Sequence, residues 1–398
     1  MSDVMHRISG EYHGERKPLF GLAFKAAILT ALTVGIYRFW AKTRIRKYIW
    51  SSVAGQGDAF EYTGTGLEKF LGFLMAIVIL AVYLGIVQMI LFYFGLTLFS
   101  EPATQAELIA QTLAFYITFL AVVPLIFFAQ YRARRYKLAR SRWRGVRFGM
   151  ESSAWGYALR AMGHWALTII TLGVLLPRQT FYLEKYMVDR TWYGDGKFEQ
   201  KGNWTGLYPA MKHLAIGLAI LIGGGILGGV TGSVAIGVIA AIVGYIWFMV
   251  GLVSYRVRAF IYLTDNKVLD GEVTFDAAPE TSTIVGTVIV GGLVVGLIVG
   301  LVFAVVGGVT SSMMGPLMFG TPVAQIIGLI AVAAIYIMAL AMAGALSLVW
   351  ITQPIIGHVV TTLNVKGADH LNTIQQRAHD DGADAEGFAG ALDVGGAI

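Results

Sequence analysis

The residues with the clearest chemical potential in this sequence are cations placed in or beside apolar segments. Lys25, Arg160 and His164 lie inside two moderately apolar stretches, and Lys212 and His213 begin a strongly apolar one. Arg160 and His164 are four residues apart, so they share one face of a helix. Because charges at membrane depth are costly and mark functional sites, these side chains are candidate contacts for a lipid headgroup or an anionic solute. The alternative is that they only extend to the membrane interface.

A second cationic group follows another apolar segment, in the run 131–147. Basic and aromatic residues alternate there: Arg132, Arg134, Arg135, Tyr136, Arg142, Trp143 and Arg144. This composition is found in binders of nucleic-acid phosphates. Beside an apolar segment, however, basic residues set topology and attract anionic headgroups by about 1 kcal/mol each, and aromatic residues lie at the interface. We therefore expect membrane lipids as partners and no nucleic acid.

Other chemistries find little support. The chain has no cysteine, which excludes thiolate metal sites and a cysteine nucleophile. The glycine-rich stretch 223–229 lies inside an apolar segment, so it predicts helix packing and not a nucleotide site. The strongly apolar segments contain no Asp or Glu in their interiors, which argues against a carrier that uses a carboxylate relay. We expect no enzyme activity, no cofactor and no metal.

The elements that carry these residues belong to a membrane protein. Hydrophobic residues make up 56% of the chain and charged residues 14%. Because about 20 apolar residues cross a bilayer, six segments predict spans: 70–99, 109–130, 214–230, 233–255, 284–306 and 324–350. The weaker segments 19–40 and 155–176 carry Lys25, Arg160 and His164, so we expect re-entrant or interfacial helices there.

The distribution of basic residues predicts the topology. The turns 100–107, 231–232 and 307–322 hold none of the 30 Lys and Arg residues. If the six spans form three hairpins, these turns face outward, and every basic loop and both termini face the cytoplasm, as the positive-inside rule requires. If the weaker segments cross instead, the basic loop 185–201 faces outward against the rule. We expect a multi-pass protein of a bacterial inner membrane.

The sequence also contains a duplication. A shift of 138 residues aligns 30–35 with 168–173 without a gap, and Lys47-Tyr48 with Lys185-Tyr186. Tyr and Phe recur twelve residues apart around Gly-containing turns, which predicts small cytoplasmic β-hairpins. The predicted regions are an N-terminal tail 1–18, repeat A 19–150, repeat B 151–280, a helical hairpin 281–358 and an acidic Gly/Ala-rich tail 359–398, both tails being cytoplasmic.

Together these patterns predict an α-helical polytopic membrane fold. It has six spans in three helical hairpins, and two re-entrant or interfacial helices bring the apolar helices to eight. Small residues at every fourth position mark two spans, at Gly224 and Gly228 and at Gly292, Gly296 and Gly300. Such stripes favour close helix packing within the molecule. The alternatives are a pore lining, a sliding surface or a contact in a homo-oligomer.

Several motifs resemble the YjgN-like family of bacterial inner-membrane proteins. They are Phe20-Gly21, Gly35-Ile36-Tyr37, Trp40-Ala41-Lys42-Thr43-Arg44, Tyr62-Thr63-Gly64-Thr65-Gly66, the run 142–149, and Glu386-Gly387-Phe388-Ala389. The resemblance covers nearly the whole chain, although Arg140-Ser141 stands where the family has Asn-Thr. The family is a domain of unknown function, so the resemblance implies location and fold alone.

Two classes of function fit these features. Duplicated units, glycine-lined helices and charged re-entrant segments resemble the parts that build solute sites, which favours transport or lipid handling. The alternative is a scaffold or envelope-stress protein whose β-hairpins recruit a cytoplasmic partner. The sequence identifies neither a substrate nor a protein partner.

Overall fold

The computed structural model describes residues 7–312 and 321–378. The chain separates into two compact units. The first unit comprises Met1–Phe60, Gly206–Lys267 and Val273–Asp369, and the second comprises Glu61–Thr205, Val268–Glu272 and His370–Ile398. Each unit therefore holds parts of both sequence repeats. The motif Glu386-Gly387-Phe388-Ala389 lies outside the described residues.

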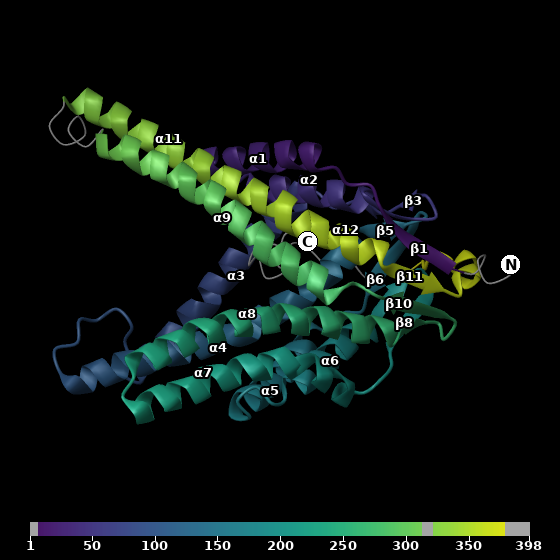
Figure 1. The fold of residues 1–398 in the computed structure, drawn as a ribbon, viewed down its shortest axis with the longest axis horizontal. Coiled ribbons are helices and arrows are strands. Elements are labelled where there is room, and N and C mark those ends of the chain that lie inside the picture. The colour runs from purple at the N-terminus through teal and green to yellow at the C-terminus, as the bar shows by residue number, and fades with distance from the viewer. Residues whose placement is uncertain (1–6, 313–320, 379–398) are drawn as a thin grey trace. The chain divides into compact units, whose positions relative to one another are not determined.

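The first unit is built mainly from paired helices (Figure 1). They are α1 (Arg16–Leu32), α2 (Arg38–Ser51), α7 (Lys212–Thr231), α8 (Val234–Asp265), α9 (Thr281–Ser312), α11 (Pro322–Ser347) and α12 (Gln353–Thr361). A 3-10 helix, Trp204–Met211, leads into α7, and a π-helical turn, Leu348–Thr352, joins α11 to α12. Helices α7 and α8 lie side by side along their length, as do α9 and α11 (Figure 1).

The second unit has four helices: α3 (Gly66–Tyr93), α4 (Gln105–Ala139), α5 (Ala154–Ile170) and α6 (Leu176–Val188). The backbone N–H of Glu68 donates to the Thr65 hydroxyl at 3.2 Å, and the backbone N–H of Glu107 donates to the Thr104 hydroxyl at 3.2 Å. Helices α3 and α4 therefore each begin with the Thr-x-x-Glu pattern of a capping box. A buried cluster joins α4, β6, α5 and α6: Phe127, Tyr131, Met150, Tyr157, Ala158, Ala161, Leu183 and Tyr186. This core holds the last turns of α4 against the start of α5.

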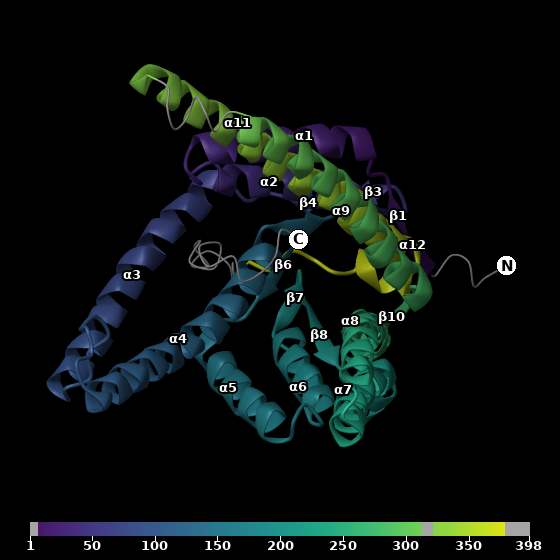
Figure 2. The ribbon, with the colours of Figure 1, turned by 60° about the vertical axis from the view of Figure 1, so that its left-hand side comes forward.

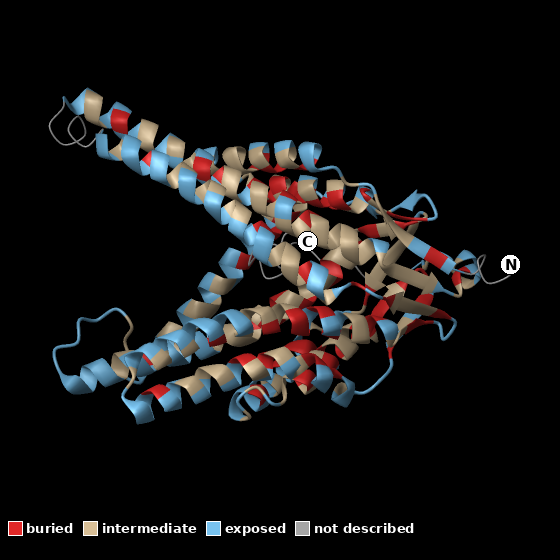
Figure 3. Cartoon of the chain, viewed as in Figure 1, coloured by how far each residue is buried: buried red, intermediate tan, exposed pale blue. Residues whose placement is uncertain are grey.

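Six helices of the described chain are long and apolar enough to cross a membrane. They coincide with the six apolar segments of the sequence: Gly66–Tyr93, Gln105–Ala139, Trp204–Thr231, Val234–Asp265, Thr281–Ser312 and Pro322–Thr361. Most of their apolar residues are exposed or half-buried (Figure 3), which fits helices whose surroundings are lipid.

The strands overturn the prediction of an α-helical polytopic fold that carries only small β-hairpins. The first unit contains β1 (Arg7–Tyr12), β2 (Val53–Gly55), β3 (Asp58–Ala59), β10 (Val273–Ala277) and β11 (Leu363–Lys366). The second contains β4 (Glu61–Tyr62), β5 (Ser141–Trp143), β6 (Val146–Met150), β7 (Thr191–Tyr193), β8 (Gly196–Gln200) and all but the first residue of β9 (Lys267–Leu269). They follow one another in an 11-stranded sheet, β3-β2-β1-β11-β10-β9-β8-β7-β6-β5-β4.

The physical reason for this correction is that a two-stranded hairpin is only marginally stable alone. Its unpaired edges offer hydrogen bonds that a further strand satisfies. The pairing of β1 with β11 illustrates this, since Ile8 lies opposite Val365 in an antiparallel register. The two strands come from opposite ends of the described chain, so no local pattern reveals their pairing.

The two weaker segments are also not single helices. Each segment holds one helix, α1 or α5, and a turn, and it ends at the start of a second helix, α2 or α6. The helices α1 and α2 contact each other as a helical hairpin, and so do α5 and α6 (Figure 2). In the first turn Val34 and Gly35 have φ values of 50° and 88°. In the second, Leu172 and Gly173 have φ values of 49° and 89°. The two turns therefore have the same backbone form, 138 residues apart.

Candidate functional site

A cavity of about 430 Å³ lies in the second unit, where the last turns of α4 meet the start of α5. Its lining residues are Phe128, Tyr131, Arg132, Arg135, Ser152, Ser153, Ala154, Trp155 and Gly156. The first four come from α4, and the others come from the β6–α5 connection and the first turn of α5. The cavity thus joins the end of an apolar helix to the beginning of a short one.

Two arginines supply its positive charge. Arg132 and Arg135 are three residues apart, so both point from one face of α4. Arg135 is buried, and its Nε donates to the Met150 carbonyl at 2.8 Å. Arg132 is half-buried, with its guanidinium carbon 5.8 Å from the centre of the Phe128 ring. Both guanidinium groups are therefore held by protein contacts at the wall of the cavity.

The start of α5 adds hydrogen-bond donors. Ser153 is the residue before the first helical turn, and its hydroxyl lies 2.6 Å from the Tyr186 hydroxyl in place of capping that turn. The amides of Ala154, Trp155 and Gly156 come at the helix start, where backbone N–H groups have no acceptor within the helix. With the helix dipole, such amides favour an anion.

The rim of the cavity is aromatic. The Trp155 ring lies 4.8 Å from the Phe128 ring, and Trp155 is 55% exposed. Phe128 belongs to the apolar part of α4, whereas Arg132 begins its basic part. The cavity therefore stands where this helix changes from apolar to charged, the depth at which tryptophan is enriched in membrane proteins.

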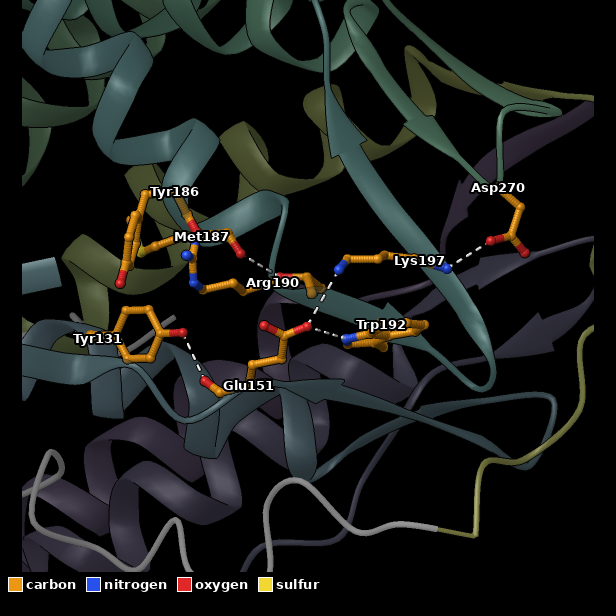
Figure 4. Close-up of polar contacts among 9 residues, drawn as sticks. Tyr131, Glu151, Tyr186, Met187, Arg190, Trp192, Lys197 and Asp270 are labelled. Atoms are coloured by element: carbon orange, nitrogen blue, oxygen red, sulfur yellow. Dashed lines mark hydrogen bonds and ion pairs between the residues drawn. The ribbon is translucent and has the colours of Figure 1, made fainter. Parts of the chain in front are cut away.

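No carboxylate stands among the described lining residues. The nearest in sequence, Glu151, directs its carboxylate to Trp192 and Lys197 (Figure 4). Its Oε1 accepts from Trp192 Nε1 at 3.2 Å and lies 3.4 Å from Lys197 Nζ, while its backbone carbonyl accepts the Tyr131 hydroxyl at 2.7 Å. The cationic lining is therefore not neutralised by this acidic side chain.

Only part of the basic run lines the cavity. Arg134 forms a bidentate ion pair with Glu184 of α6, at 2.6 and 2.8 Å. Tyr136 donates to Glu68 at 2.9 Å, and Trp143 is buried in strand β5. Two further members lie beyond α4: Arg142 is half-buried in β5, and Arg144 stacks 4.4 Å from the Trp143 ring in the next turn.

The histidine and arginine predicted on α5 have contacts of their own. Arg160 donates to the Gly156 carbonyl at 3.0 Å and lies 4.7 Å from the Tyr186 ring. His164 stacks on Tyr182, with ring centres 5.5 Å apart, and its Nδ1 is 3.5 Å from Arg178 Nη1. Burial, and then the positive charge of Arg178, lower the pKa of His164. Neither Arg160 nor His164 lines the cavity.

The remaining predicted cations belong to the first unit. Lys25 on α1 and Lys212 at the start of α7 are exposed. His213 is half-buried, with its ring centre 6.0 Å from that of Trp247. Among the described residues, no three His, Asp or Glu side chains are grouped in a way that could hold a metal ion.

The two glycine stripes have different surroundings. A Cβ added at Gly224 would overlap the Cβ of Ala240, and one added at Gly228 would come within 2.9 Å of the Gly237 nitrogen, so both glycines permit the close approach of α7 and α8. A Cβ added at Gly292, Gly296 or Gly300 meets no described atom within 4 Å. Within the described chain, this second stripe therefore makes no close helix contact.

Sequence reasoning missed the α5 half of the cavity. Ser152 and Ser153 stand directly before an aromatic and apolar stretch, which is the ordinary signal for the start of a helix. That signal predicts that hydroxyl groups and the backbone amides of the first helical turn lie together at the start of a helix. It does not reveal that α4 brings Arg132 and Arg135 to the same point.

The comparisons with known proteins agree with the membrane character of the fold. A family model described as a bacterial protein of unknown function, DUF898, matches residues 7–306. The chain is similar to the inner membrane protein YjgN of Salmonella typhimurium, with 26% identity over 225 residues, 56% of this chain and 46% of that protein. It is also similar to the inner membrane protein YjgN of Escherichia coli K12, with 26% identity over 146 residues, which cover 37% of this chain and 32% of that protein.

The chain spans less than half the length of these curated relatives, and no solved structure matches it. The family match nevertheless covers most of the chain, and six of its helices are long and apolar enough to cross a membrane. The chain therefore belongs to the YjgN-like family of bacterial inner membrane proteins, DUF898, whose function is unknown.

Proposed function

We propose that this membrane protein handles anionic lipids and binds the phosphate of a lipid headgroup in the cavity between α4 and α5. The observation that carries the proposal is the lining itself. Two arginines from one helix and the opening amides of another converge on one cavity, and the described lining has no carboxylate.

The chemistry of the lining suits a phosphate group. Guanidinium groups bind phosphate oxygens through paired, charge-assisted hydrogen bonds. Amides at a helix start and serine hydroxyls supply further donors at fixed positions. A volume of about 430 Å³ falls in the range of small-molecule sites, so it accommodates a headgroup and leaves the acyl chains outside. The aromatic rim of Phe128 and Trp155 supports chains that run along the apolar surface of α4.

The distribution of charge supports placing this headgroup site at the cytoplasmic face. The turn between α3 and α4 carries no Lys or Arg, whereas the opposite end of α4 carries the basic run. By the positive-inside rule, the basic end and the cavity belong to the cytoplasmic side, with both termini. Anionic lipids of that leaflet are then the natural ligands. The proposal requires neither a catalytic group nor a cofactor.

The test is headgroup-selective binding by the detergent-purified protein. Native mass spectrometry would compare short-chain phosphatidylglycerol with phosphatidylcholine of the same chains, and inorganic phosphate would represent the free anion. We expect Arg132→Gln to weaken phosphatidylglycerol binding about 10-fold or more, since a hydrogen bond to a charged group contributes roughly 1.5–3 kcal/mol. Lys201→Gln removes an equal charge from an exposed side chain outside the cavity and should leave binding unchanged.

The pattern of results separates the alternatives. Equal losses in the two variants would mean that only net charge matters and would refute the cavity as the site. Binding of inorganic phosphate without a preference for phosphatidylglycerol would assign the cavity to a soluble anion. Lipid binding that survives Arg132→Gln would place the lipid elsewhere on the protein.

A further inference from the structure

We infer that the hairpins α1–α2 and α5–α6 are membrane-dipping elements, each of which inserts its turn into the hydrocarbon of one leaflet and returns to the side from which it came. This goes beyond headgroup binding, because it assigns a lipid-facing role to two surfaces outside the cavity. It rests on the composition of the turns, on their backbone hydrogen bonds and on the residues that follow them.

Both turns present bare apolar side chains. Val34 is 93% exposed and Leu172 is 86% exposed, and their neighbours Ile36 and Val174 are exposed as well. Surface turns in water are ordinarily built from Gly, Asn, Asp, Ser and Pro. Large apolar residues at the apex of both copies form exposed patches that require a partner.

The apex residues also hold a strained backbone. Val34 and Leu172 have φ values of 50° and 49°, in the left-handed region that glycine and asparagine favour. For a β-branched valine this conformation is especially unfavourable. Both copies therefore place an apolar side chain where a polar asparagine would fit the backbone better.

The first turn satisfies its own backbone donors. Every backbone N–H from 33 to 38 donates a hydrogen bond inside the hairpin. Five of them donate to backbone carbonyls: Thr33 to Leu29, Val34 to Ala31, Gly35 to Thr30, Ile36 to Thr33 and Arg38 to Gly35. The sixth, the N–H of Tyr37, donates to the Thr33 hydroxyl. That hydroxyl in turn donates to the Leu29 carbonyl at 2.7 Å.

The second turn repeats this arrangement at 171–176. Thr171 donates to Leu167, Leu172 to Ile169, Gly173 to Thr168, Val174 to Thr171 and Leu176 to Gly173, while Leu175 donates to the Thr171 hydroxyl. A turn in water does not need such complete pairing, since water satisfies its amides. Hydrocarbon supplies no such partner, so an inserted segment must pair its backbone internally.

The residues behind each apex select a bilayer over a protein partner. In α1–α2, Tyr37 and Trp40 stack with ring centres 6.4 Å apart, and Arg44 lies 5.8 Å from the Tyr37 ring. In α5–α6, Arg178 lies 5.4 Å from the Tyr182 ring. In both hairpins the residues that follow the apolar apex are thus an aromatic ring and a cation in contact, the pair of residue types that lies at the interface between hydrocarbon and headgroups.

The length of the exposed apolar part agrees with insertion into one leaflet. The base of α5 packs in the core through Ala158 and Ala161, and exposed apolar residues run from Trp165 to Val174. At 1.5 Å per residue, the helical part of this stretch, from Trp165 to Ile170, rises about 8 Å, and with the turn beyond it the hairpin stays within half of a hydrocarbon core of about 30 Å. A hairpin of this reach enters the bilayer and returns.

The absence of cysteine makes the inference directly testable. Single cysteines at Val34 and Leu172 would carry an environment-sensitive fluorophore in reconstituted vesicles. We expect quenching of both by lipids with brominated acyl chains and little quenching by iodide. Ser51, the exposed last residue of α2, and Glu199, an exposed residue of β8, should show the opposite pattern and serve as controls. Iodide quenching at the two apices would overturn the inference and assign them to a water-facing contact.

A second measurement tests the return of the chain. An impermeant thiol reagent would be applied to intact cells that carry single cysteines at Ser152, Glu199 or Ala103. A hairpin that returns leaves Ser152 and Glu199 on one face, so both should react alike and differently from Ala103 in the α3–α4 turn. Reaction of only one of the pair would show that α5–α6 crosses the bilayer, and the inference would fail.

Discussion

The hairpins α1–α2 and α5–α6 share a turn but differ at the start of their first helix. Glu15 precedes α1, and Ser153 occupies the corresponding place before α5, 138 residues later. In both copies a tyrosine of the second helix holds this residue: the Tyr48 hydroxyl donates to the Glu15 carbonyl at 2.9 Å, and the Tyr186 hydroxyl donates to the Ser153 carbonyl at 3.3 Å. The scaffold is duplicated, whereas the helix start is not.

On the proposal of a headgroup site, this difference accounts for an anion site in one copy and none in the other. The carboxylate of Glu15, before α1, compensates the positive end of the helix dipole and repels an external anion. The neutral Ser153 leaves the first amides of α5 for a ligand, and Arg132 and Arg135 of α4 add the charge. On these two proposals, membrane insertion is a property of the duplicated turn, and headgroup recognition is a property of the helix start that differs between the copies.

The largest effect is expected from making the second copy resemble the first. Ser153→Glu places a carboxylate at the cavity, and repulsion between like charges costs several kcal/mol, so phosphatidylglycerol binding should fall about 100-fold. Native mass spectrometry measures the loss. The control Glu15→Ser removes the carboxylate before α1 and should leave binding unchanged. Unchanged phosphatidylglycerol binding by Ser153→Glu would show that the start of α5 is not part of the binding site.

The next effect concerns the apex that both copies share. Leu172→Asp places a charge where we propose hydrocarbon, at a penalty of roughly 2.5–3.5 kcal/mol at the centre of the bilayer. The variant should lose quenching by brominated lipids at a fluorophore on the neighbouring Val174, whereas Leu172→Asn should retain more of it because asparagine tolerates the left-handed backbone. Val34→Asp should act in the same way on the first hairpin. Unchanged quenching by brominated lipids in both Leu172→Asp and Val34→Asp would show that these turns do not enter the bilayer.

A smaller effect is expected from the tyrosines that hold each helix start. Tyr48→Phe and Tyr186→Phe each remove two hydrogen bonds, which contribute about 1 kcal/mol each, so both should lower the thermal unfolding temperature by a similar amount. Only Tyr186→Phe should also change phosphatidylglycerol affinity, because its partner Ser153 lines the cavity. A change in affinity with Tyr48→Phe would contradict the assignment of binding to one copy.

The smallest effect is a pH dependence confined to the second hairpin. Burial and Arg178 lower the pKa of His164 below its ordinary value of 6.5. The unfolded chain then binds a proton that the folded chain does not, so His164 should reduce stability as the pH falls through 6.5 towards the lowered pKa. Thermal unfolding between pH 7.5 and 5.5 measures this loss, and His164→Gln should reduce it. The first hairpin has Ala26 at the matching position. A loss that persists in His164→Gln would assign the dependence to other groups.

The sequence by itself determined the elements whose causes are local. Long runs of apolar residues produce helices in any context that buries them, and all six predicted segments became such helices. The duplication was also visible as a repeated string, and the structure shows the same turn in both places. Even there, sequence reasoning extended each first helix through its turn, in the segments 19–40 and 155–176, because the turn residues Val34 and Leu172 are apolar and carry no usual turn signal. It did not predict the second helices, α2 and α6.

Tertiary structure decided everything that depends on which segments meet. The strands are two to six residues long, too short for sequence to specify their partners, and the pairing of β1 with β11 joins distant parts of the chain. The same holds for the basic run, since adjacent residues on a helix point about 100° apart. Arg134 therefore contacts Glu184, while Arg135 lines the cavity, and only the packing of α5 and α6 against α4 distinguishes an arginine paired within the fold from one that lines the cavity.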